Sequence, residues 1–383
     1  MSASPHHQRI QAVFEGRWAD RVPICEQAFA SSVASRILGR EAVTGSSDVH
    51  YFQARAWFQS DQAHAEFLDR LYRDALELCR RLDLDIFHPP WRLGMRPTQQ
   101  VDEYTLIYGS EQAGDWRMYR YDPVTRTYGH VRSARPAADL DDVLAQMRRA
   151  VDAWQGPPQP QLDVLMLRAI REIGSERVVA GSSGIAVPIE PGYLAATAVD
   201  PGLVAAWVDM QVENNLAMLD EQARVGIRLI NGGGDFAFNS GPVYSPRFFE
   251  EVMAPRWKRL FDRARQLGMW YVMRSDGNLW PVAQALFGWA HPDAYYECDY
   301  DAGMRFGPLR EAFPELVLMG NLSCDLLHQA APEQIRRRVI ECIQAAGPRV
   351  VISSANAILH GTPPENVLAM YETAKSYPVP GKP

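Results

Sequence analysis

Arg274 and Asp276 are separated by one residue in the segment Arg274-Ser-Asp-Gly-Asn278, which follows an apolar run. Residues two apart share one face of an extended chain, so both side chains can point to the same side. The arginine suits binding of a substrate carboxylate, and the aspartate beside it can take a proton or ligate a metal. A structural ion pair is the alternative. We expect Arg274 and Asp276 to be catalytic residues.

Several other polar residues also come directly after short apolar runs. They are Glu26, His88 with Trp91 and Arg92, Asp235, Glu297 with Cys298, Asn321, and Asn356 with His360. If those runs are the parallel strands of one barrel, their carboxyl ends meet at a single mouth and these side chains become neighbours. The sequence therefore predicts one polar site built from several strands.

Each of these residues also has a structural alternative. Three glycines precede Asp235, so a ligand can approach its carboxylate closely, but the same group can cap the next helix. Two prolines follow His88 and keep the backbone extended, so its ring is either presented to the mouth or packed at the rim. Glu297 can act as a catalytic acid or metal ligand, or accept rim hydrogen bonds. His360, in a loop that enters a helix, has the same two alternatives.

The elements that must position these residues alternate regularly between apolar runs and helical patterns. Eight apolar runs are candidate strands, at residues 21–25, 84–87, 177–180, 226–230, 269–273, 293–296, 316–319 and 349–353. Helical patterns precede several of them, at 213–224, 247–266, 282–287, 307–312 and 333–345. Strands buried on both faces read as nearly continuous apolar runs, and eight of them are what a closed parallel barrel requires. We predict a distorted (β/α)8 TIM-type barrel and a single domain over 1–383.

Residues 101–132 break this alternation. They are rich in Tyr, Thr, Trp and Arg, with turn signals at Tyr108-Gly109, Gly114-Asp115 and Tyr128-Gly129. Short polar and aromatic segments between such turns are typical of antiparallel strands. We predict a β-meander inserted after the second strand of the barrel, followed by a helix over 138–154.

Composition narrows the class of protein and of partner. Hydrophobic residues make up 47% of the chain and charged residues 22%, which indicates a globular protein with a sizeable core. A formal net charge of −7 argues against nucleic acid as a partner. Five widely spaced cysteines without a C-x-x-C pair indicate reduced thiols, and no run is long enough to span a membrane. We expect a cytoplasmic protein that acts on a small molecule.

Motifs along the chain resemble those of the uroporphyrinogen decarboxylase superfamily. The motifs are Arg9-Ile-x-Ala-Val-Phe-x-Gly16, Asp20-Arg-Val-Pro23, Gly241-Pro-Val-Tyr-Ser-Pro246 with Pro255, Asp276-Gly-Asn278, Gly320-Asn-Leu322 and Thr362-Pro-Pro-Glu-Asn-Val-Leu-Ala-Met370. The resemblance runs from about residue 9 to 376 and implies a distorted (β/α)8 barrel. That superfamily includes the porphyrinogen decarboxylase and corrinoid-linked methyltransferases, and it often forms homodimers.

Two site patterns of the superfamily are altered in this sequence. The Arg-Gln-Ala-Gly-Arg substrate loop of the decarboxylase corresponds to Cys25-Glu-Gln-Ala-Phe29, which has no arginine. The thiol-activating methyltransferases carry zinc on a His-x-Cys pair and a later Cys, where this sequence has Arg274-x-Asp276 and Asn356. The altered patterns argue against tetrapyrrole decarboxylation and against a cysteine-rich zinc site.

The resemblance favours methyl transfer from a small methoxy- or methylamino-type substrate to a corrinoid on a separate protein, or to a related acceptor. Asp276 and Glu297 then handle protons or an oxygen-ligated divalent metal, and Arg274 grips an anionic group of the substrate. The remaining substrate contacts are expected from His88, Trp91, Asp235, Tyr244, Asn356 and His360. A cofactor-free decarboxylase or other lyase, and a non-catalytic ligand-binding barrel, are the alternatives.

Overall fold

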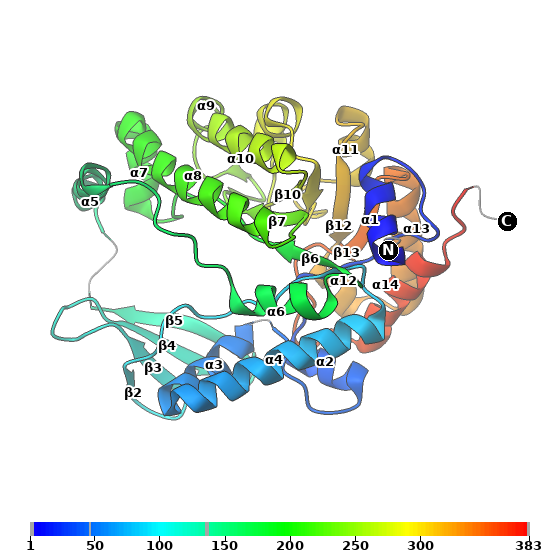
Figure 1. The fold of residues 1–383 in the computed structure, drawn as a ribbon, viewed down its shortest axis with the longest axis horizontal. Coiled ribbons are helices and arrows are strands. Elements are labelled where there is room, and N and C mark those ends of the chain that lie inside the picture. Colours follow the sequence, from blue (N-terminus) through cyan, green and yellow to red (C-terminus); the bar gives the residue numbers. More distant parts are fainter. Residues whose placement is uncertain (1–3, 46, 135–137, 381–383) are drawn as a thin grey trace.

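The computed structural model describes residues 4–45, 47–134 and 138–380. Its centre is a curled sheet of seven parallel strands (Figure 1). In spatial order they are β1 (Ile86–Phe87), β6 (Val178–Gly181), β7 (Leu229–Gly233), β10 (Trp270–Arg274), β11 (Ala294–Tyr296), β12 (Val317–Leu322) and β13 (Val350–Ser354). The order follows the sequence, as expected for strands joined by repeated crossovers.

Residues 23–25 lie between the two edges of this sheet. On one side the backbone N–H of Cys25 donates to the carbonyl of Ile352 at 3.1 Å, and that of Ile352 donates to Pro23 at 3.0 Å. On the other side the N–H of Asp85, next to β1, donates to the carbonyl of Ile24 at 2.8 Å. This short extended segment is the first of the eight predicted strands, and the distorted (β/α)8 barrel is confirmed.

Both faces of the strands are apolar, because one lines the barrel interior and the other meets the helices. Ile86, Leu229 and Val272 belong to the interior cluster, whereas their neighbours Phe87 and Ile230 pack in the outer core. The N-terminal helix α1 (Pro5–Phe14) contributes Ile10 and Val13 to the interior cluster, and its Phe14 stacks on Trp270 with ring centroids 4.6 Å apart. The helix thereby closes the amino end of the barrel.

Helices surround the barrel (Figure 1). They are α2 (Ser31–Leu38), α3 (Ser47–Gln59), α4 (Asp61–Leu82), α5 (Leu140–Ala153), α6 (Val164–Ile173), α7 (Pro191–Val199), α8 (Pro201–Arg224), α10 (Ala254–Gln266), α11 (Phe306–Ala312), α12 (Cys324–Gln329), α13 (Pro332–Ala346) and α14 (Pro364–Ser376). The pattern predicted at 213–224 is the second half of α8, which begins where Asp200 caps the N–H of Leu203. None of the described helices is long and apolar enough to cross a membrane.

The helix predicted over 247–266 is interrupted. A short turn, α9 (Pro246–Phe248), leads into a π-helical segment, η1 (Phe249–Met253), before α10. Pro255 has no N–H to donate to the turn before it, and a wider π turn is a common way to accommodate that loss. The helix predicted over 282–287 is similarly irregular, with η2 (Trp280–Val282) and the π-helical η3 (Gln284–Ala290).

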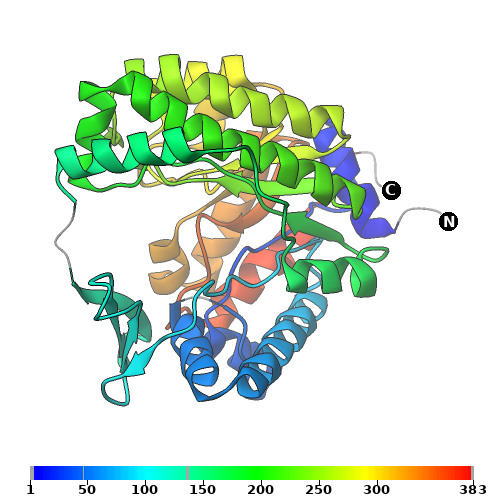
Figure 2. The same ribbon diagram turned by 60° about the vertical axis from the view of Figure 1, so that its left-hand side comes forward.

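The predicted meander is present as an antiparallel sheet that follows β1. Its strands are β2 (Gln99–Gln100), β3 (Thr105–Tyr108), β4 (Arg117–Asp122) and β5 (Thr127–Ser133). The sheet packs on α3, where Tyr51 stacks on Tyr121 with ring centroids 4.1 Å apart. Figure 2 shows this sheet at the lower left, below the helices α5, α7 and α8 and apart from the barrel strands. That 1–383 forms one domain stays a prediction.

Candidate functional site

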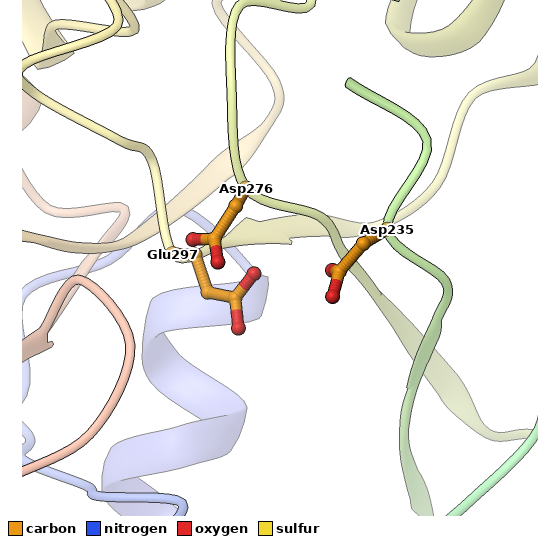
Figure 3. A group of neighbouring side chains, drawn as sticks. All are labelled: Asp235, Asp276 and Glu297. Atoms are coloured by element: carbon orange, nitrogen blue, oxygen red, sulfur yellow. The ribbon is translucent and has the colours of Figure 1, made fainter. Parts of the chain in front are cut away.

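Three carboxylates meet at the carboxyl end of the barrel. Asp235, Asp276 and Glu297 follow the neighbouring strands β7, β10 and β11, and one oxygen from each lies within 4.8 Å of the other two. Figure 3 shows the three side chains turned toward one another. Asp235 is exposed, Asp276 is half-buried and Glu297 is fully buried. We call these residues the acidic trio.

The backbone at Glu297 is held in an unusual conformation that directs its side chain toward the other two members of the trio, Asp235 and Asp276. Glu297 and the next residue, Cys298, have φ values of 83° and 41°, which non-glycine residues rarely adopt. Asn321 stabilises this turn, because its N–H donates to the Glu297 carbonyl at 3.1 Å and its Nδ2 to the Cys298 carbonyl at 2.6 Å. Gly320 allows the close contact, since a Cβ there would lie 2.5 Å from the Glu297 carbonyl oxygen.

Asp276 is held from both its backbone and its side chain. Gly277, with φ 83°, lets the chain pass against the hairpin β8 (Ala237–Phe238) and β9 (Gly241–Pro242), because a Cβ there would lie 2.6 Å from the Ala237 carbonyl oxygen. The Asn356 Nδ2 donates to Asp276 Oδ2 at 2.8 Å. Asp276 is therefore held in its place within the trio by an amide from the loop after β13.

Glu297 receives its two partners on one oxygen only. Arg274 Nη1 lies 3.3 Å from Glu297 Oε1, and Gln27 Nε2 donates to the same oxygen at 2.9 Å. The other oxygen, Oε2, is buried and has no hydrogen-bond partner among the described residues. The Arg274 guanidinium also lies 5.5 Å from the centre of the Trp91 ring. Arg274 thus forms an ion pair, and its partner is Glu297.

Burial and mutual repulsion raise the pKa values of two members of the trio, Asp276 and Glu297. Burial, followed by the charge of Asp276, holds the pKa of Glu297 well above its usual value, and Arg274 opposes this shift. Burial, followed by the charge of Asp235, raises the pKa of Asp276 to about 6. A group of carboxyls in this state keeps a proton near neutral pH or accepts a cation.

Two cavities adjoin the trio. One, of about 980 Å³, is lined by Asp235, Asp276 and Asn356, and the other, of about 870 Å³, by Trp91, Arg92 and Arg274. The single mouth expected from the sequence is thus divided, and Arg274 and Asp276 line different cavities. The physical reason is the end of β10 at Arg274: beyond it the chain turns toward the β8–β9 hairpin and no longer keeps the alternation of a strand.

The remaining predicted residues lie in three different surroundings. The neutral ring of His88, its pKa lowered to about 4 by burial, has Nδ1 3.0 Å from the Glu26 carbonyl, and its buried Nε2 has no partner among the described residues. Tyr244 is buried, stacks on Phe236 with ring centroids 6.0 Å apart, and lines neither cavity. His360 is exposed, with Nδ1 2.7 Å from Ser32 Oγ.

One contact residue was not among the predicted ones. Gln27 is 4% exposed, and its Nε2 donates both to Glu297 Oε1 and, at 2.6 Å, to the Asn356 carbonyl. It ties together the ends of the first strand, β11 and β13. One feature of the sequence could have identified Gln27 as a site residue: it comes directly after Glu26, within the segment that ends the first strand.

The donors around the trio do not fit the thiolate zinc site that the family resemblance implies. The trio offers carboxylate oxygens only. Cys298 is fully buried and its thiol donates to the Tyr295 carbonyl at 3.3 Å. Cys324 lines the 980 Å³ cavity, but its thiol donates to the Ala357 carbonyl at 3.4 Å and it does not belong to the trio. Zinc in thiolate sites requires ionised sulfur ligands.

Comparison with known proteins gives matches in family and in fold. No curated protein matches this chain. A methyltransferase from Methanosarcina mazei has the same fold, with a TM-score of 0.61, 14% sequence identity, and coverage of 98% of this chain and 99% of that one. A candidate vitamin-B12-independent methionine synthase from Listeria monocytogenes gives a TM-score of 0.47 at 13% identity, covering 93% and 98%.

The family match is confined to the second half of the chain. The model of the uroporphyrinogen decarboxylase (URO-D) family matches residues 192–377, which contain the whole acidic trio, Arg274 and Asn356. The motifs between residues 9 and 23 lie outside the matched range. The resemblance to the uroporphyrinogen decarboxylase family is therefore shown over residues 192–377, just under half of the chain.

Proposed function

We propose that this protein is an enzyme that transfers a methyl group from the oxygen or nitrogen of a small methoxy- or methylamino-type substrate to a corrinoid or related acceptor. The observation that carries the proposal is the acidic trio, two of whose carboxyl groups, those of Asp235 and Asp276, lie on the wall of a cavity of about 980 Å³ at the mouth of the barrel. Small-molecule sites of barrel enzymes lie at this end of the strands.

Removal of a methyl group from oxygen or nitrogen requires a positive charge, such as a proton, at the oxygen or nitrogen that acts as the leaving group. A nucleophile bonds to the methyl carbon while the electron pair of the carbon–heteroatom bond moves to oxygen or nitrogen, which then takes a proton. Asp276 lines the cavity, and its pKa of about 6 makes it a donor for that proton near neutral pH. Asn356, at 2.8 Å, orients the carboxyl group, and water restores its proton after the transfer.

The rim of the same cavity suits an apolar acceptor. Ile189, Phe238 and Leu359 line the cavity and are 41%, 56% and 43% exposed. Large apolar side chains exposed together mark contact surfaces. A reduced corrinoid, when bound, supplies the nucleophile for the methyl group. The rim supports an acceptor that arrives from outside, carried by a separate protein.

Incubation of the protein with methoxy- and methylamino-compounds and reduced cobalamin tests this proposal. We expect the absorbance of methylcobalamin to appear with at least one compound, and to be lost in Asp276→Asn. The matched control is Asp301→Asn, because Asp301 is an exposed carboxylate that lines the same cavity, and it should keep the activity. A flat spectrum across the panel, or full activity in Asp276→Asn, would contradict the proposal.

Arg274 favours one alternative, a cofactor-free decarboxylase. It lines the 870 Å³ cavity beside Trp91, and Glu297 engages one of its nitrogens at 3.3 Å. The rest of a guanidinium can hold a substrate carboxylate while a neighbouring acid protonates the carbanion left by loss of carbon dioxide. Carbon dioxide release from carboxylic acid substrates without cobalamin, abolished in Arg274→Ala, would favour this activity over methyl transfer.

A further inference from the structure

We propose that the acidic trio binds one divalent cation that prefers oxygen ligands, of the Mg²⁺ or Mn²⁺ type. The proposal concerns Asp235, Asp276 and Glu297 and does not depend on the methyl-transfer activity. Its basis is the geometry of the three carboxylates, an unpartnered buried oxygen, and the balance of charge around them.

The spacing of the trio suits a small cation. One oxygen from each carboxylate lies within 4.8 Å of the other two. Mg²⁺ is bound by oxygen at about 2.1 Å, so two ligands on opposite sides of the ion are about 4.2 Å apart. The carboxylates must therefore draw closer to bind the ion, and the side chain of Asp235, which is exposed, has room to move.

Glu297 presents an oxygen whose partner is missing from the protein. Its side chain is fully buried, and both Gln27 and Arg274 contact Oε1. Oε2 is buried without a hydrogen-bond donor among the described residues, although its carboxylate faces Asp235 and Asp276 (Figure 3). A buried carboxylate oxygen without a partner is strongly unfavourable. A cation between the three carboxylates supplies that partner.

The charges call for a divalent ion. Among the described residues, Arg274 is the cationic side chain in ion-pair contact with the trio, through Glu297. Three carboxylates and one guanidinium leave two negative charges, which a divalent cation balances.

The surroundings select the kind of cation and its function. The trio offers oxygen and neither sulfur nor imidazole nitrogen, which favours Mg²⁺ or Mn²⁺ over zinc. Asp235 and Asp276 line the 980 Å³ cavity, whereas Glu297 lies behind them. The ion would therefore be held on the cavity wall, with its open positions taken by water or a substrate oxygen. A metal ion there would polarise the oxygen or nitrogen of the substrate, in place of the proton of Asp276.

Mn²⁺ binding to the full-length protein tests the site without any assay of activity. The protein is stripped with a chelator, and MnCl₂ is titrated while the electron paramagnetic resonance signal of free Mn²⁺ is recorded. We expect one site per chain, competed by Mg²⁺. Asp235→Asn and Glu297→Gln should each weaken Mn²⁺ binding at least tenfold, in the range known for altered metal sites.

Two exposed carboxylates of the same cavity provide matched controls. Asp301→Asn and Asp325→Asn remove charge from the lining without touching the trio, and they should bind Mn²⁺ like the unchanged protein. Circular dichroism verifies the fold of each variant, and Glu297→Gln serves if Asp235→Asn does not fold. Absence of a stoichiometric site, or equal affinity in Glu297→Gln and the unchanged protein, would overturn the proposal. So would an equal loss in Asp301→Asn, because it would indicate diffuse attraction to the cavity.

Discussion

Two buried glutamates at the carboxyl end of the barrel, Glu26 and Glu297, differ in how their oxygens are satisfied. Glu26 is 4% exposed and accepts hydrogen bonds from Ser354 Oγ at 2.9 Å, Tyr371 OH at 3.0 Å, Ser354 N at 3.1 Å and Tyr296 OH at 3.2 Å. Glu297 is fully buried, and its two partners share one oxygen. The two side chains are buried to nearly the same extent, but within the described part of the chain Glu26 accepts hydrogen bonds on both carboxylate oxygens and Glu297 on only one.

This difference separates a structural carboxyl group from a functional one. A buried polar group with donors on both oxygens fixes the packing around it and has nothing left to bind. A buried group with a free oxygen that faces two other carboxylates is costly unless something outside the chain completes it. We therefore assign Glu26 to the scaffold and Glu297 to the site, and each prediction below tests that division.

Glu297→Gln should give the largest effect. The amide keeps the size of the side chain but can neither ionise nor ligate a cation as a carboxylate does, so methyl transfer should fall about 1000-fold, within the range for loss of acid–base catalysis. The free energy of unfolding should stay equal or rise, because repulsion within the trio is relieved. Initial rates and chemical denaturation measure the two quantities. A clear loss of stability with full activity would place Glu297 in the scaffold instead.

Glu26→Ala should show the opposite pattern. It removes the carboxylate that accepts from the hydroxyls of Tyr296 and Tyr371 and from the N–H of Ser354, and it leaves a cavity, so unfolding should become easier by about 4 kcal/mol. Denaturant titration followed by circular dichroism measures this loss. Affinity for Mn²⁺ should stay within twofold in the folded fraction. If Mn²⁺ affinity fell with stability unchanged, the two glutamates would have exchanged roles.

The pH dependence of stability provides a third test. Burial raises the pKa of Glu26 from its usual 4.5 to about 7, against the opposing effect of its hydrogen bonds. The folded state then binds the proton more tightly than the unfolded state, so the stabilisation is complete below pH 4.5 and declines as the pH rises toward 7. Relative to Glu26→Gln, which does not titrate, the unchanged protein should lose up to about 3 kcal/mol over this window. A relative gain in stability with rising pH would mean that the hydrogen bonds to the ionised form dominate.

The fold was predictable because each strand carries apolar residues on both faces. Leu229 and Ile230 point to opposite sides of β7 and are both fully buried, so a continuous run replaces the alternation of a surface strand. The long helix α4 was not among the predicted elements, and the π-helical segments were predicted as regular helix. A π turn depends on how a neighbouring proline is accommodated, and the spacing of apolar residues along the sequence does not reveal this.

The sequence could predict only those site residues that come directly after strands. Asp235, Asp276 and Glu297 follow strands, and parallel strands bring such residues to one end of the barrel. The contact of Gln27 with Glu297 joins residues 270 positions apart, and an amide carries no charge pattern that reveals it. Tyr244 lies just before a helix, where the sequence does not show whether a ring faces the mouth or the core. The structure packs it in the core against Phe236.

Asn356→Ala should give the smallest effect and shows how much of the site depends on orientation. The variant removes the hydrogen bond of 2.8 Å to Asp276 but keeps the backbone carbonyl that accepts from Gln27, so the position of Glu297 is preserved. We expect a loss of about tenfold in kcat with little change in KM, corresponding to about 1.4 kcal/mol for one hydrogen bond to a charged group. Steady-state kinetics separate the two parameters. A rise in KM alone would mean that Asn356 binds the substrate directly, and an effect as large as that of Glu297→Gln would mean that the trio cannot hold its geometry without this amide.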